Sequence, residues 1–199
     1  MPFSGATHGV TTETVERFYV DAGAVFLNYG EADERPLGAT RGGNTFTVEQ
    51  DVREMEIDGL PGPLAGARRI VTVRPTIEAN LLELGTDNML LALTGAEATA
   101  IDQDGGGGGN THDSIRRSRS IALSDYITNI ALVGEVLGTT RRGIFIVYNA
   151  ISTENFEIGT SDEDEAVLTL TLAGHFNAAD LDATGVAEEP WEIRWPIVV

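Results

Sequence analysis

The clearest pattern in the chain is a two-residue alternation of apolar and polar positions between residues 71 and 81. Its apolar members are Val71, Val73, Pro75, Ile77, Ala79 and Leu81. Successive side chains of a β-strand point to opposite faces, so the alternation predicts one long strand, although residues 76–84 also have helix propensity. Pro75 cannot donate to a sheet ladder and therefore predicts an edge or an irregularity at its position.

Other apolar stretches predict further strands. Residues 18–29 are rich in aromatic and β-branched side chains, which favours a strand buried on both faces. Residues 46–57 change the parity of their apolar positions, which predicts a β-bulge within 52–55. Two apolar runs, 126–133 and 144–148, flank a turn and predict a hairpin.

The last third of the chain alternates again. In 166–172, Ala and Leu side chains face one way, while a Thr-rich set faces the other and is not expected in the core. Residues 191–195 predict a short closing strand. A short helix is expected over 87–94, with Thr86 as its cap and a glycine after its end, and a one-turn helix over 177–180.

Seven or eight strands and one short helix predict a mainly β fold, an antiparallel β-sandwich or small barrel flanked by the helix. We expect one domain over 18–199, preceded by an N-terminal arm, 1–17, that is ordered only if something else holds it. Long loops are expected at 30–44, 58–68 and 102–120, where glycine, proline, aspartate and asparagine collect.

The charge of the chain limits its partners. It has 31 acidic and 13 basic residues and a net charge of −18, and every cation is an arginine. DNA and anionic lipid both require a basic face, so neither is expected to be bound. No apolar run approaches 18 residues, so no membrane-spanning helix is predicted. We interpret the acidic surface as halophilic adaptation, with an arginine-favouring genome as the alternative.

No enzymatic constellation is evident. The absence of cysteine excludes a disulfide framework, a thiolate metal site and a cysteine nucleophile. The histidines are His8, His112 and His175, and they show no ligand spacing. The glycine run 105–109 lacks the residues of a phosphate loop. No catalytic, cofactor or metal site is predicted, and the acidic runs 102–104 and 162–165 are interpreted as solvated surface.

One basic cluster stands out in this acidic chain. Arg116, Arg117 and Arg119 follow the glycine run on a flexible excursion. Nucleic-acid binding would require aromatic partners and a surrounding basic field, and both are missing. We favour a contact between this cluster and an acidic patch on another copy, with a solvated loop as the alternative. Arg41, in the 30–44 loop, is assigned to the same kind of self-assembly contact.

Five segments carry a resemblance to a known family. They are DAGAVFLNYG (21–30), LGATRGGNTFTVEQDVREMEIDG (37–59), GPLAGARR (62–69), NLLELGTDNMLLAL (80–93) and PWEIRW (190–195). In this order they resemble the major tail, or tail tube, protein of long-tailed viruses over most of 18–196. The glycine- and arginine-bearing segment 105–119 and the absence of lysine depart from the bacterial-virus pattern and point to a virus of a halophilic archaeon.

The resemblance implies a β-sandwich flanked by a helix that forms hexameric rings, which stack through long loops and the terminal arm into a tube. The implied partners are copies of the same chain and the tape-measure, tail tip and tail terminator proteins. Viral DNA would pass through without specific binding, and the protein would be located in the virion tail after assembly in the host cytoplasm. The alternatives are a capsid-decorating or tail-terminator sandwich, or a ligand- or carbohydrate-binding module.

Overall fold

The computed structural model describes residues 10, 14, 17–103, 105, 109–117, 120–162, 164–178 and 188–197. These residues form antiparallel sheets with one α-helix. This arrangement confirms the mainly β, sandwich-like fold class that the alternating patterns predicted.

The sandwich has two layers, which share one strand. The first layer has the order β2–β1–β7–β8–β10, and the second has the order β9–β4–β3. The strands of the first are β1 (Ala24–Leu27), β2 (Arg35–Pro36), β7 (Ile127–Glu135), β8 (Arg142–Ser152) and β10 (Trp191–Arg194). Those of the second are β3 (Thr40–Glu54), β4 (Arg68–Leu81) and β9 (Leu168–Ala173).

Strand β8 passes from the first layer into the second. Its residues 144–147 pair with β10, whereas Ile151 and Ser152 pair with β9 on the same edge. Asn149, between these two pairings, has a φ of 48°. This left-handed conformation is uncommon for a non-glycine residue and redirects the strand, and asparagine is among the residues that adopt it most readily.

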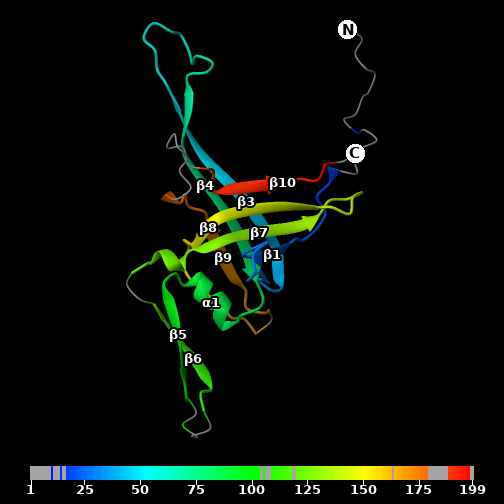
Figure 1. The fold of residues 1–199 in the computed structure, drawn as a ribbon, viewed down its shortest axis with the longest axis vertical. Helices are drawn as coiled ribbons and strands as arrows, with labels where there is room; N and C mark the ends of the chain where they lie inside the picture. Colours follow the sequence, from blue (N-terminus) through cyan, green and yellow to red (C-terminus); the bar gives the residue numbers. More distant parts are fainter. Residues whose placement is uncertain are drawn as a thin grey trace.

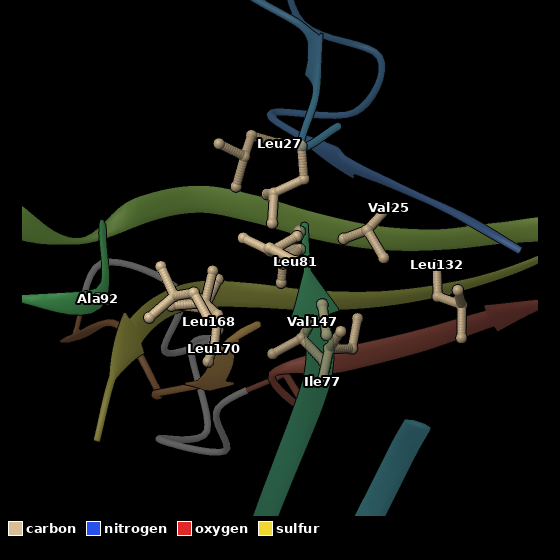
Figure 2. Close-up of a cluster of buried hydrophobic side chains, with 14 residues drawn as sticks. Val25, Leu27, Ile77, Leu81, Ala92, Leu132, Val147, Leu168 and Leu170 are labelled. Atoms are coloured by element: carbon tan, nitrogen blue, oxygen red, sulfur yellow. The ribbon is translucent and has the colours of Figure 1, made fainter. Parts of the chain in front are cut away.

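The core lies between the two layers (Figure 2). Every second side chain of β4 and β9 points inward, as their sequence alternation predicted. The innermost members are Ile77, Ala79, Leu81, Leu168, Leu170 and Leu172, each at most 1% exposed. Burial of a side chain of this size stabilises the fold by about 1.5–3 kcal/mol, so these two strands anchor the second layer.

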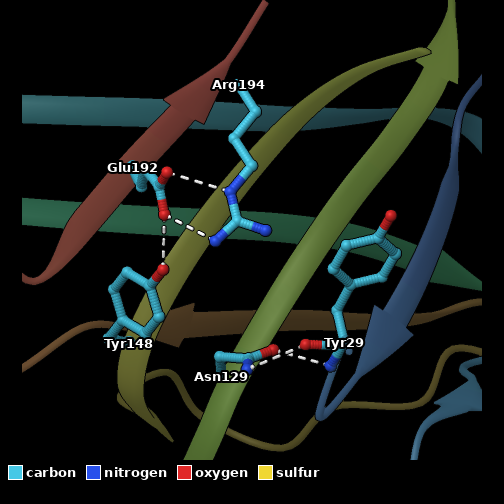
Figure 3. A network of polar contacts seen from close by, with 5 residues as sticks. All are labelled: Tyr29, Asn129, Tyr148, Glu192 and Arg194. Carbon is cyan, nitrogen blue, oxygen red and sulfur yellow. Dashed lines mark hydrogen bonds and ion pairs between the residues drawn. The ribbon is translucent and has the colours of Figure 1, made fainter. Parts of the chain in front are cut away.

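Strand β7 is buried on both faces. Residues 129–134 are all buried, and Ala131, Val133 and Ile146 form a second apolar cluster on the side away from the main core. The Asn129 side chain accepts a hydrogen bond from the Tyr29 N–H at 2.7 Å and donates one to the Tyr29 carbonyl at 3.2 Å (Figure 3). This pair of bonds holds the chain after β1 against β7.

Helix α1 (Thr86–Ala92) begins differently from the sequence expectation. Gly85 is its N-cap residue and no side chain caps the helix. Thr86, the expected cap, donates its hydroxyl hydrogen bond to Asp113 at 2.9 Å instead. Gly95 has a φ of 68°, in line with the left-handed stop that was predicted after the helix.

Two hairpins leave the sandwich in opposite directions (Figure 1). We call the first the long arm; it consists of the outer parts of β3 and β4, 49–54 and 68–74, and their connection, 55–67. The second, the short hairpin, consists of β5 (Ala96–Ile101) and β6 (His112–Arg117), which form a separate two-stranded sheet.

Two of the expected loops contain strands. The 30–44 segment includes β2, which pairs with the end of β1, and the first residues of β3. The 102–120 segment includes β6, so only 102–111 connects the two strands of the short hairpin. Composition alone predicted loops in both segments, because these strands pair through their backbones and have no alternating apolar pattern in their glycine-rich and polar sequences. The connection 55–67 lies close to the expected loop, 58–68.

The first predicted strand is shorter and more exposed than expected. Within 18–29, only β1 is regular strand, and Phe18 and Val20 are 49% and 63% exposed. The arm 1–17 and the helix at 177–180 lie largely outside the described residues. The bulge occurs near the expected place, but its extra residue is Val71 of β4, because pairing shifts between Asp51–Thr72 and Val52–Ile70.

Candidate functional surfaces

The long arm exposes many apolar side chains. They are Val52, Met55, Ile57, Leu60, Leu64, Ile70 and Val71, each 45% to 62% exposed. The two arm strands continue the second layer beyond the core. The face of β4 that carries the buried Ile77 also carries Ile70, where it is exposed to solvent. A concentration of exposed apolar side chains of this kind is typical of an interaction surface.

The same arm carries cations and acids in opposing positions. Glu54 and Arg68 form an ion pair at 2.6 Å, and Glu49 lies directly across from Arg74. Arg53 lies directly across from Arg69, which is a like-charge cross-strand pair and destabilises an isolated ribbon.

The short hairpin is held to the body by a hydrogen bond from helix α1. Thr86 bonds to Asp113 of β6, which pairs with Ala100 near the outer end of the two strands, whereas Arg117 pairs with Ala96 at the hairpin's root. Arg116 and Arg117 are exposed and make no ion pair within 4 Å to any residue of the described ranges. An isolated two-stranded hairpin is only marginally stable in water, so contact with another surface would stabilise this one.

The predicted assembly arginines lie on different elements. Arg41, at the start of β3, bonds to Glu165 at 2.7 Å and to Asp164 at 3.3 Å, so its guanidinium is engaged within its own chain. Arg116 and Arg117 are on the short hairpin, whereas Arg119 lies outside the described residues. The structure therefore does not bring Arg41 and the cluster into one site.

The outer face of the second layer is polar. Its side chains over the body are Thr45, Thr47, Thr76, Glu78, Asn80, Thr169 and Thr171. Thr169 donates a hydrogen bond to Asn80 Oδ1 at 2.8 Å, and Asn80 donates to the Gly43 carbonyl at 3.3 Å. The Thr-rich side of β9 that the sequence separated from the core is part of this face. These seven positions include one acid and no arginine; the next pair on the same face, Glu49 and Arg74, belongs to the long arm.

A polar network ties β8 to β10 (Figure 3). The Tyr148 hydroxyl donates to Glu192 at 2.6 Å, and Arg194 donates to the same carboxylate at 2.8 and 2.9 Å. The bonds from Arg194 and then from Tyr148 hold the pKa of Glu192 below its usual value. Burial, and then the bond to Glu192, raises the pKa of Tyr148. The network fixes the closing strand on the sandwich.

The two tryptophans belong to an aromatic cluster at one end of the sandwich. Trp195 packs against Phe145 and Tyr19, and Trp191 packs against Phe46. Phe46 also contacts Phe145 at 5.3 Å, so the rings join β3, β8, β10 and the segment before β1. The rings contact one another between elements, and Trp195 remains 42% exposed.

The described residues contain little reactive chemistry. His112 shares a hydrogen bond with the Thr111 hydroxyl, and His175 donates to the Ala173 carbonyl and packs edge-on against Tyr126. No group of three potential metal ligands occurs among the described residues. Within the same ranges, no helix has the length and apolar character needed to span a membrane.

Comparison with known proteins gives no relative for this chain: no family model matches it, and no curated protein matches it.

Proposed function

We propose that this protein is a self-assembling structural subunit, the major tail protein of a long-tailed virus, which forms stacked hexameric rings and a conduit for the genome. The observation that carries the proposal is the pair of hairpins that project from opposite ends of the sandwich (Figure 1). A subunit with different contact surfaces at its two ends forms heterologous contacts, and these generate rings or open stacks.

The surfaces of the sandwich support the same function. The long arm exposes apolar residues that a neighbouring copy can bury, and the short hairpin exposes Arg116 and Arg117 to acidic surfaces, which are abundant on every other copy. The polar face of the second layer suits a channel lining, because hydroxyl and amide groups solvate passing DNA while the absence of arginine among them avoids capture of phosphates.

Assembly of this kind requires no chemical step and no cofactor. Its free energy comes from the surface that neighbouring copies bury and from backbone pairing between them. A tail tip and a tape-measure protein would nucleate the rings, and a tail terminator protein would be a further partner. The virion tail is the location that this function requires.

Negative-stain electron microscopy of the purified protein at high salt tests the proposal. Open-ended tubes of stacked rings are the expected result. Isolated trimers or single closed rings would favour a decoration or terminator protein instead, and a protein that stays monomeric at all salt and protein concentrations would contradict a self-assembling function.

A further inference from the structure

Strand β4 has an open edge in the long arm. The Gly174 N–H donates to the Pro75 carbonyl at 2.9 Å, and β9 ends there. Since this carbonyl points away from β3, the backbone N–H and carbonyl of Val73, two residues along the strand, point the same way. No described residue pairs with Val73 on that side, and a groove between β4 and 174–176 runs along this edge.

Strand β3 has an open edge on the other side of the same arm. It pairs with β4 and with no other described strand. Gln50 lies directly opposite Val73, and the two form a non-hydrogen-bonded pair of the antiparallel ladder. In a pair of this kind the backbone N–H and carbonyl groups of both residues point outward, away from each other. The arm is therefore a two-stranded ribbon with an unpaired edge on each side, which is a template for further strand pairing.

The two edges differ in charge. The β3 edge carries Glu49, Asp51 and Glu54, with Arg53 as its one cation. The β4 edge carries Arg68, Arg69 and Arg74, and no acid lies between 68 and 74. Opposite charges that face each other on neighbouring strands stabilise pairing by about 0.2–1 kcal/mol, and like charges oppose it.

We propose that neighbouring copies of this chain pair through their long arms, with the β3 edge of one copy against the β4 edge of the next. Because β3 and β4 are antiparallel, repetition of this contact builds one antiparallel sheet from copies that all point the same way. Pairing of like edges would place arginine beside arginine or acid beside acid. The contact is therefore directional, and it specifies the interface of the proposed self-assembly on which it rests.

Two proline substitutions test the edges separately. Val73→Pro removes the outward N–H of β4, and Gln50→Pro, the matched variant directly across the ribbon, removes that of β3. Neither N–H is used within the arm, so circular dichroism and thermal unfolding should show folded proteins. Each variant alone should raise the concentration needed for assembly by at least about tenfold, or about 1.4 kcal/mol, in sedimentation experiments.

A mixture of the two variants gives the sharpest result. Val73→Pro keeps a working β3 edge and Gln50→Pro keeps a working β4 edge, so an equimolar mixture should form one-to-one dimers and nothing larger. A charge exchange makes the same test without proline. Arg74→Glu and Glu49→Arg should each weaken assembly by more than the change in monomer stability that their like-charge pair within the arm causes, and both together should restore it, because residues 49 and 74 again have opposite charges.

The outcomes separate this inference from the proposed function. Tubes that form equally well from the wild type and from all these variants would overturn edge pairing and leave the tail tube proposal standing. If the wild type forms filaments or unstacked rings, and the variants abolish them, the result would support edge pairing and contradict a tube. A wild-type protein that never associates would overturn both proposals. If the β4 edge bound a different acidic partner instead of a second copy, the edge pairing alone would be overturned.

Discussion

Gly174 lies where strands β4 and β8 and the residue before β10 meet. A β-carbon at this position would lie 2.6 Å from a Val147 methyl group, 2.9 Å from the Pro75 ring and 3.0 Å from the Pro190 carbonyl. These atoms belong to β8, to β4 and to the residue before β10, so no single side chain can move to make room. Glycine at this position permits the close approach on which the junction of the sandwich depends.

Replacement of Gly174 by alanine should therefore lower the free energy of unfolding by about 1–3 kcal/mol, the usual effect of overpacking. Urea denaturation measures it. Gly159→Ala is the matched control, because a β-carbon there meets no atom within 4 Å. Equal stability of the two variants would show that the junction is looser than the structure indicates.

The Glu192 network provides a second test at single residues. The folded-state pKa of Glu192 is below its ordinary value, so its contribution to stability is present at neutral pH and is lost as the pH falls through that lowered pKa. Glu192→Gln should cost about 0.5 kcal/mol at pH 7, since both partners are partly exposed.

The pH dependence distinguishes this effect from a general loss of charge. The difference in melting temperature between wild type and Glu192→Gln should shrink in acid, where the wild-type carboxyl is protonated. Glu157→Gln, at an exposed position with no hydrogen bond to a described residue, should match the wild type throughout. A Glu192→Gln difference that persisted unchanged at pH 2 would contradict the linkage.

Among the elements, those whose burial alternates along the sequence could be predicted. The inward leucines and outer threonines of β9 follow from alternation, because one face of this strand meets the core. The β7–β8 hairpin follows from two continuous apolar runs that flank a turn. The strands β2 and β6 could not be found in this way, since one is two residues long and the other lies on a hairpin without a core face.

The candidate surfaces were predictable to a smaller extent. The sequence identified the Thr-rich face and the arginine cluster, but the open edges at Val73 and Gln50 depend on where β9 ends, which is a tertiary property. The separation of acids in 49–54 from arginines in 68–74 was visible in the sequence. Its meaning required the pairing of these two segments in one ribbon.

The short hairpin gives a prediction at the scale of an element. Changing Arg116, Arg117 and Arg119 together to serine should slow or abolish polymerisation, because the basic cluster would no longer meet acidic surfaces of other copies, while the monomer keeps its melting temperature. The rate of polymerisation is measured by light scattering. The double change at Arg116 and Arg117 has a matched control of the same charge, the double change at Arg141, in the β7–β8 turn, and Arg142, the first residue of β8. This control should have a smaller effect. Normal tubes from the triple variant would exclude a role of the hairpin arginines.

At the scale of the whole molecule, the net charge of −18 sets the conditions under which it can fold and associate. Mutual repulsion of surface acids destabilises the compact state, and a ring of several copies multiplies that repulsion. The proposed assembly would therefore depend on apolar and backbone contacts, on a few arginines and on counterions. The exposed apolar residues of the long arm and its unpaired edges would supply the first two.

Salt should consequently stabilise both the monomer and its assembly. The Debye length falls from about 30 Å at 0.01 M to about 3 Å at 1 M, so repulsion between surface carboxylates is largely removed over this range. The melting temperature should rise steadily between these NaCl concentrations, and the concentration needed for assembly should fall in parallel. Sucrose at matched osmolality is the control, because it favours burial without screening charge. Equal stability at low and molar NaCl would remove the halophilic interpretation and leave arginine-favouring genomic bias as the explanation of the composition.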